Sequence, residues 1–111
     1  MKYSLHITKS AEIDLIRASD YIEYNLLNPQ ASNDLLDKVE EAFGKLSQMP
    51  QIHQLIDDPV LKPCGIRYVL IDNYMAFYKI NEETKNIYII RFLYGKRNWI
   101  EILKNEQLSP Q

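Results

Sequence analysis

The chain has 111 residues, the size of one ordinary domain, and hydrophobic residues make up 46% of it, which is enough for a core. Its net charge of −2 argues against a general nucleic-acid binder, no apolar run approaches the ~20 residues that span a bilayer, and the single Cys64 excludes an internal disulfide. We therefore expect one cytoplasmic domain over residues 1–111 that makes no contact with a membrane.

The first segment, residues 2–7, alternates apolar and polar side chains, which predicts a half-buried strand. The side chains on its apolar face are Tyr3, Leu5 and Ile7. Thr8 or Ser10 can cap a helix that follows directly. The apolar stripe of this helix consists of Ala11, Leu15, Ala18 and Ile22. Polar residues, Asp14 among them, fall mostly outside the stripe, so we expect an amphipathic helix.

A second helix is predicted to begin at Asn28, which suits the N-cap, and Pro29, which suits the first helical position. Its apolar stripe is Leu35, Val39, Ala42 and Leu46, flanked by Leu36 and Phe43. Met49 and Pro50 end the helix. Because only a few residues join the two helices, they are predicted to form an antiparallel hairpin.

Residues 51–65 lack a clear period and contain two prolines and Gly65, which predicts a loop that runs over the surface. The next three segments are rich in Ile, Val, Tyr and Phe, which is typical of strands. They comprise residues 66–71, 74–80 and 86–94. A tight turn at Asp72-Asn73 and a longer loop join them into a predicted antiparallel meander. Beyond Trp99, either a short helical turn or an extension of the last strand can follow.

The order of these elements predicts an α+β fold, in which an N-terminal strand and an antiparallel helical hairpin precede a three-stranded antiparallel meander. We expect the helices to pack on one face of the sheet. The strands of the second half are apolar on both faces, so we also expect the sheet to be well covered.

Two arginines lie among apolar neighbours in these strands. Arg67 alternates with Val69 and Ile71, and Arg91 shares its expected strand face with Ile87, Ile89 and Leu93. A buried arginine is costly unless it is paired, so an edge position or a buried ion pair is one interpretation. The other is an anion-binding site, because a guanidinium group matches the geometry of phosphate and carboxylate.

Basic and aromatic residues are densest at Tyr94, Lys96, Arg97 and Trp99. Such a group can clamp phosphates and stack bases. Alternatively, Trp99 closes the end of the sheet while the two cations lie in solvent. Residues 1–60 carry five basic and ten acidic residues, whereas residues 61–111 carry eight and five, so this group lies in the basic half of the chain. No spacing of His6, His53 and Cys64 suggests a metal site, and we expect no metal and no cofactor.

Three blocks of the sequence resemble the RelE/ParE superfamily of bacterial toxins, which belong to type II toxin–antitoxin modules. The blocks are ITKSAEIDL at Ile7–Leu15, GIRYVLIDNYMAFYKI at Gly65–Ile80 and IIRFLYGKRNW at Ile89–Trp99. They cover almost the whole chain in the order of the family. The resemblance implies a helical hairpin against an antiparallel sheet, a cognate antitoxin protein as partner, and a role such as plasmid stabilization. It leaves open a homodimer or a toxin–antitoxin hetero-oligomer.

The superfamily contains two main activities, and the resemblance implies different residues for each. RelE-like members cleave mRNA on the ribosome, which would make Arg67, Arg91, Tyr94 and Arg97 the catalytic residues of a ribosome-dependent endoribonuclease. ParE-like members inhibit DNA gyrase without known chemistry. The residues expected to bind the target are then Lys96, Arg97 and Trp99.

Several RelE-like residues are replaced in this chain. Arg97 matches the arginine of the RelE-like GKR block, but the middle-strand arginine after Tyr74 is replaced by Met75, and no histidine follows His53. The late tyrosine of RelE-like toxins falls near Leu103. RNA cleavage needs groups that accept and donate a proton, and arginine is a poor base. We therefore favour a ParE-like gyrase inhibitor. An mRNA interferase is the alternative, and a degenerate toxin that retains only antitoxin binding is a third hypothesis.

Overall fold

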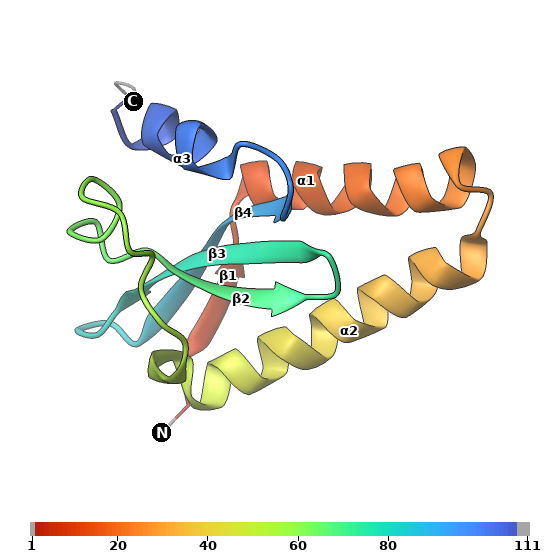
Figure 1. Cartoon of the computed structure of the whole chain (residues 1–111). Coiled ribbons are helices and arrows are strands. Elements are labelled where there is room, and N and C mark those ends of the chain that lie inside the picture. The colour runs from red at the N-terminus through yellow and green to blue at the C-terminus, as the bar shows by residue number, and fades with distance from the viewer. Residues whose placement is uncertain (1, 109–111) are drawn as a thin grey trace.

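The computed structural model describes residues 2–108. The helices and short helical turns are α1 (Lys9–Asp20), a π-helical turn η1 (Tyr21–Asn25), α2 (Pro29–Gln48), a 3₁₀ turn η2 (Pro50–Ile52) and α3 (Trp99–Leu108). The strands are β1 (Ser4–Ile7), β2 (Arg67–Ile71), β3 (Tyr74–Asn81) and β4 (Asn86–Tyr94). This order confirms the predicted α+β fold with a helical hairpin and a β-meander (Figure 1). No helix within residues 2–108 combines the length and the apolar character needed to span a membrane.

The four strands form one sheet in the order β1-β4-β3-β2. β2 pairs antiparallel with β3, and β3 pairs antiparallel with β4, which confirms the meander. β1 pairs parallel with β4, a feature that the sequence pattern did not indicate. β2 is therefore an edge strand, and β1 covers only the first half of the outer edge of β4.

Local capping signals place the helix ends where the sequence predicts them. The Thr8 side chain accepts a hydrogen bond from the N–H of Ala11 at 3.3 Å, so Thr8 is the N-cap of α1. Asn28 caps α2 in the same way through the N–H of Ala31 at 3.1 Å, and Pro29 occupies the first helical position. These two caps fix the start of both helices of the hairpin.

Apolar side chains from the sheet fill a core on each of its faces. Successive residues of β3 alternate, so Ala76 and Tyr78 join the core under α1 and α2, whereas Met75 and Phe77 join the core on the opposite face. The members of this second core include Ile56, Leu61, Ile66, Leu93 and Leu103. The expectation that all helices pack on one face is therefore wrong for α3, which supplies Leu103 to the second core.

The segment from Pro50 to Ile66 is anchored at several points. The Tyr78 hydroxyl donates to the Pro50 carbonyl at 2.7 Å, and burial raises the pKa of this phenol to about 12. Ile56 and Leu61 are fully buried. The prediction of a plain surface loop is wrong because these apolar side chains supply the second core, although they follow no regular period.

A β-bulge divides β4. Phe77 pairs with Arg91 but Tyr78 pairs with Ile89, so Ile90 is an extra residue on β4. The bulge reverses the alternation of side chains. Consequently Ile89 lies in the core under the hairpin and Leu93 lies in the second core, and the expectation that Arg91 shares one face with both is wrong.

Candidate functional site

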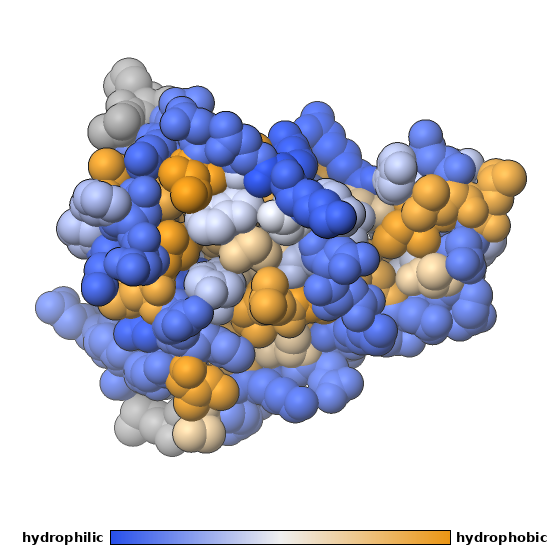
Figure 2. Space-filling model, viewed as in Figure 1, coloured by the Kyte–Doolittle hydropathy of each residue, from blue (hydrophilic) through white to orange (hydrophobic). Residues whose placement is uncertain are grey.

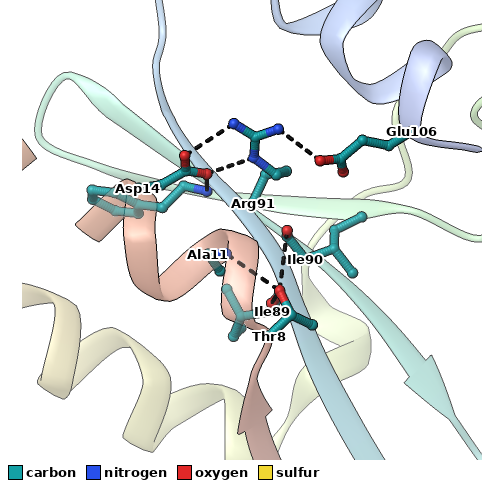
Figure 3. A network of polar contacts seen from close by, with 8 residues as sticks. Thr8, Ala11, Asp14, Ile89, Ile90, Arg91 and Glu106 are labelled. Carbon is teal, nitrogen blue, oxygen red and sulfur yellow. Dashed lines mark hydrogen bonds and ion pairs between the residues drawn. The ribbon is translucent and has the colours of Figure 1, made fainter. Parts of the chain in front are cut away.

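Two side chains, one at the N-cap of α1 and one within α1, form hydrogen bonds with backbone groups of β4 where its pairing with β1 ends. The Thr8 hydroxyl donates to the carbonyl of Ile89 at 2.8 Å and to that of Ile90 at 3.2 Å. Six residues further along the chain, the Asp14 carboxylate accepts a hydrogen bond from the backbone N–H of Phe92 at 3.0 Å. Thr8, the N-cap of α1, and Asp14 within α1 replace the backbone partners that a longer β1 would supply (Figure 3).

Arg91 points from the bulge toward two carboxylates. Its Nε and Nη2 donate to the two oxygens of Asp14 at 2.6 and 2.9 Å, and its Nη1 donates to Glu106 of α3 at 2.7 Å (Figure 3). The side chains of Arg91 and Asp14 are only 15% and 4% exposed. The hydrogen bonds that Arg91 donates to Asp14 raise the pKa of Arg91, although burial opposes the shift. The cation is thus neutralised inside the protein.

Asp14 is the residue of this network that the sequence pattern missed. It lies outside the apolar stripe of α1, yet it is buried and joins α1 to the bulge of β4. A carboxylate can be recognised as buried only when its partner is known, and Arg91 lies 77 positions away in the sequence. The unexplained arginine among apolar neighbours was the available signal, because such an arginine needs an acidic partner.

Arg67 also makes structural contacts, at a different place. Its Nη1 donates to the carbonyl of His53 at 2.6 Å and to that of Gln51 at 3.5 Å. Arg67 pairs with Tyr78 on β3, whereas Tyr94 pairs with Tyr74. Four residues of strand separate these positions, about 13 Å at the usual rise. The structure therefore does not bring Arg67 together with Tyr94.

Tyr94 and Arg97 do come together, at the rim of a hollow of about 500 Å³. The hollow lies between the tip of the helical hairpin and the end of the sheet that carries the β2–β3 turn. The residues that line it are Tyr21, Ile22, Leu26, Asn73, Tyr74, Tyr94 and Arg97. We call this feature the tip hollow. Of the four residues expected to be catalytic in a nuclease, only Tyr94 and Arg97 line it.

Tyr74 forms a rigid aromatic wall of the tip hollow. Its ring stacks on Phe92 with centroids 5.0 Å apart and meets the Tyr94 ring edge-on at 5.7 Å. Burial, and then the neighbouring Tyr94 and Tyr21, raise the pKa of Tyr74 above its ordinary value. The shift favours the neutral phenol, which is a poor proton acceptor.

The residues around Gly95 divide into a buried part and an exposed part. The Gly95 N–H donates to the Asn73 carbonyl at 2.8 Å, and a Cβ on Gly95 would lie 3.2 Å from that oxygen, so the close approach favours glycine. Trp99 is half-buried against Phe77, with ring centroids 5.3 Å apart. Lys96 and Arg97 are exposed, and within residues 2–108 their charged groups have no hydrogen-bond or ion-pair partner.

The other titratable groups considered from the sequence lie away from the tip hollow. The ring of His6 stacks on Tyr88, and the ring of His53 lies edge-on to Tyr78. Over the described part of the chain, no group of three or more His, Cys, Asp or Glu side chains is placed to hold a metal ion. The titratable side chains that line the tip hollow are the phenols of Tyr21, Tyr74 and Tyr94 and the guanidinium of Arg97.

Replacing Arg97 with alanine is expected to change the free energy of unfolding by no more than about 0.5 kcal/mol, because an exposed cation without a partner contributes little to stability. Urea denaturation of the purified variant measures the change. A loss of 2 kcal/mol or more, on the order of a broken buried interaction, would show that Arg97 has a structural role and would remove it from the candidate site.

Comparison with protein families places the chain among toxins. Residues 5–99 match the family described as the ParE toxin of type II toxin–antitoxin systems, parDE. The match includes the hairpin, β2 to β4, all of β1 except Ser4, and Arg97. No curated protein matches the sequence significantly.

Solved structures share the fold at low sequence identity. The ParDE system of Pseudomonas aeruginosa matches with a TM-score of 0.67 and 21% identity, over 84% of this chain and 96% of the other. The RelBE2 complex of Mycobacterium tuberculosis matches with a TM-score of 0.60 and 23% identity, over 85% and 99%. An arginine double mutant of Escherichia coli RelE in the free state matches with a TM-score of 0.66 and 11% identity, over 98% and 100%.

Proposed function

This chain belongs to the ParE toxin family of type II toxin–antitoxin systems, and we propose that it arrests growth by binding DNA gyrase and that it does not cut RNA. The observation that carries the proposal is the placement of the cations. Arg67 donates to backbone carbonyls and Arg91 to two carboxylates, so neither guanidinium is free to hold a phosphate. A single cation, Arg97, lines the tip hollow.

The chemistry available at the hollow also supports binding without catalysis. Cleavage by attack of a 2′-hydroxyl needs a base near neutral pH, an acid and several cations around the phosphate. The hollow offers three phenols and one guanidinium. In general a tyrosine phenol ionises only at about pH 10 in water and arginine is a poor base, so neither residue type readily accepts a proton at neutral pH. At the position of the RelE-like middle-strand arginine, Met75 is buried in the second core.

A RelE-like mRNA endonuclease is the second candidate. Tyr94 and Arg97 both line the tip hollow, which favours this candidate. The phenol of Tyr94 can donate a proton, and the guanidinium of Arg97 can bind a phosphate. The fold of E. coli RelE, which this chain shares, is compatible with either activity.

The two candidates differ in what an induced toxin does inside a cell. We expect induction of this chain to stop growth and to switch on a DNA-damage reporter, while the 5′ ends of cellular mRNA stay unchanged. The Arg97→Ala variant, at equal level and stability, should stop growth less effectively. Ribosome-dependent cleavage products that vanish in Arg97→Ala and Tyr94→Phe would favour the endonuclease, and normal growth with folded wild-type protein would favour the degenerate toxin.

A cognate antitoxin is the expected partner, because the ParDE and RelBE structures with the same fold are toxin–antitoxin systems. We expect a disordered antitoxin segment to fold on the groove between α2 and the edge strand β2, where Leu70 is 66% exposed. The residues that line this groove include Lys38, Glu41, Ala42, Lys45, Val69 and Leu70. We call it the edge groove.

Hydrogen exchange with and without antitoxin tests this placement. Backbone amides of β2 and the facing side of α2 should exchange more slowly in the complex, because an added strand or helix covers the open edge. Co-expression of the antitoxin should also restore growth. Protection confined to residues 51–65 would place the antitoxin elsewhere and reject the edge groove as its site.

A further inference from the structure

The tip of the helical hairpin exposes apolar side chains that the core does not use. The exposed fractions are 53% for Tyr21, 65% for Tyr24, 57% for Leu26 and 81% for Leu27. In Figure 2 apolar surface gathers at the end of the hairpin that projects beyond the sheet. Contiguous apolar side chains in water are unusual away from binding surfaces.

The backbone holds this tip in one specific form. η1 widens the helix at its end, where the Leu26 N–H donates to the Tyr21 carbonyl at 3.1 Å. Leu27 has a φ of 53°, in the left-handed region that a leucine rarely adopts. Both a π-helical turn and a strained residue are more frequent at functional sites than elsewhere.

Contacts between the two helices keep the tip rigid. The buried Ser32 hydroxyl donates to the Ser19 carbonyl at 3.1 Å, and the two serine hydroxyls lie 2.7 Å apart. Asn28 caps α2 directly after the strained Leu27. The exposed leucines are therefore presented on a fixed support, which lowers the entropy lost on binding.

The tip forms one wall of the tip hollow, and the end of the sheet forms the other. The lining is apolar and aromatic at Ile22, Leu26 and Tyr74, and Arg97 is the one charged side chain among the residues that line the hollow. This combination suits an apolar side chain with a carboxylate beside it. It suits a nucleic-acid strand less well, because one cation holds few phosphates and one face of the Tyr74 ring is already stacked on Phe92.

We infer that the tip hollow binds an apolar or aromatic side chain of the toxin's target protein, with a neighbouring aspartate or glutamate of that protein paired to Arg97. The inference rests on the proposed function, since it assigns the target-binding surface of the same toxin. The tip hollow shares no lining residue with the edge groove. The two surfaces adjoin at the β2–β3 turn, where Asp72 lines the edge groove and Asn73 lines the tip hollow, whereas Leu70 and Leu26 line one surface each. A toxin of this shape can bind its antitoxin through one surface and its target through the other.

Two leucine substitutions test the assignment. Leu26→Glu places a carboxylate in the tip hollow, and Leu70→Glu places one in the edge groove, at a leucine of similar exposure. Leu26→Glu should weaken target binding on the order of 10- to 100-fold, the range for losing one buried leucine contact, and should relieve growth arrest while antitoxin affinity stays unchanged. Leu70→Glu should keep growth arrest and bind antitoxin more weakly.

Leu26→Ala is a milder substitution at the same position. Thermal melts of every variant show whether a weaker growth arrest results from unfolding or from the loss of target binding. Full growth arrest by folded Leu26→Glu and Leu26→Ala would overturn the inference, and so would a loss of antitoxin affinity in these two variants. Ribosome-dependent cleavage that depends on Leu26 would make RNA the occupant and would overturn it too. If the leucine variants relieve arrest but wild-type protein neither inhibits gyrase nor causes cleavage, the tip hollow stands as the target surface and the gyrase proposal fails.

Discussion

Replacing Asp14 with alanine is expected to lower the free energy of unfolding by about 3–5 kcal/mol, the range for removing one partner of a buried ion pair. The carboxylate is 4% exposed and accepts three hydrogen bonds, two from Arg91 and one from the backbone of Phe92. The variant leaves the guanidinium with Glu106 as its remaining carboxylate and leaves a buried N–H without its acceptor.

Urea denaturation measures this loss, and Glu106→Gln is the matched control. The Glu106 side chain is 33% exposed and makes a single hydrogen bond to Arg91, so its removal should cost about 1 kcal/mol or less. A loss below about 1 kcal/mol in Asp14→Ala would mean that the network adds little to stability. Arg91 would then be available for a role in binding.

Replacing Met75 with arginine is expected to destabilise the fold by several kcal/mol, on the order of the cost of an unpaired buried charge. Met75 is 7% exposed and belongs to the second core with Phe77 and Leu93. Met75→Leu nearly conserves volume and should cost less than about 1.5 kcal/mol. Thermal melts of the two variants measure the difference.

The Met75→Arg substitution also distinguishes gyrase inhibition from RNA cleavage. It restores the residue type that RelE-like toxins carry after the middle-strand tyrosine. In a weakened nuclease, a cation at the phosphate contributes on the order of 10²-fold or more to the rate. We expect Met75→Arg to produce no RNA cleavage on translating ribosomes. A stable Met75→Arg variant that cleaves mRNA would show that the site is a nuclease that lacks one cation.

The parts of the fold that sequence predicted correctly depend on local signals. Thr8, Asn28 and Pro29 mark helix starts through contacts with residues three positions away or through a fixed dihedral angle. The turn at Asp72-Asn73 and the three strands of the meander follow from turn residues and from segments rich in Ile, Val, Tyr and Phe. Each of these features can be recognised within a few residues of sequence.

The parts that were missed depend on distant partners. The parallel pairing of β1 with β4 joins segments about 80 positions apart, and the bulge at Ile90 lies directly after this pairing ends. For Arg91, the sequence was consistent with either a buried ion pair or an anion-binding site. The position of Asp14 in the structure shows that Arg91 forms the ion pair. The tip hollow was missed because it depends on how the connection between the two helices lies against the end of the sheet, and that connection contains Leu26 and Leu27. Two leucines in a polar turn were the available signal.

The most direct test of the proposed mechanism is a supercoiling assay with purified DNA gyrase, relaxed plasmid and this chain. We expect the wild-type protein to inhibit supercoiling and an equimolar cognate antitoxin to restore it. Arg97→Ala should inhibit supercoiling less than the wild type at equal concentration, because it removes the free cation of the tip hollow. Undiminished supercoiling at saturating amounts of folded wild-type protein, together with mRNA cleavage on translating ribosomes, would contradict the account and assign the chain to the endonuclease branch.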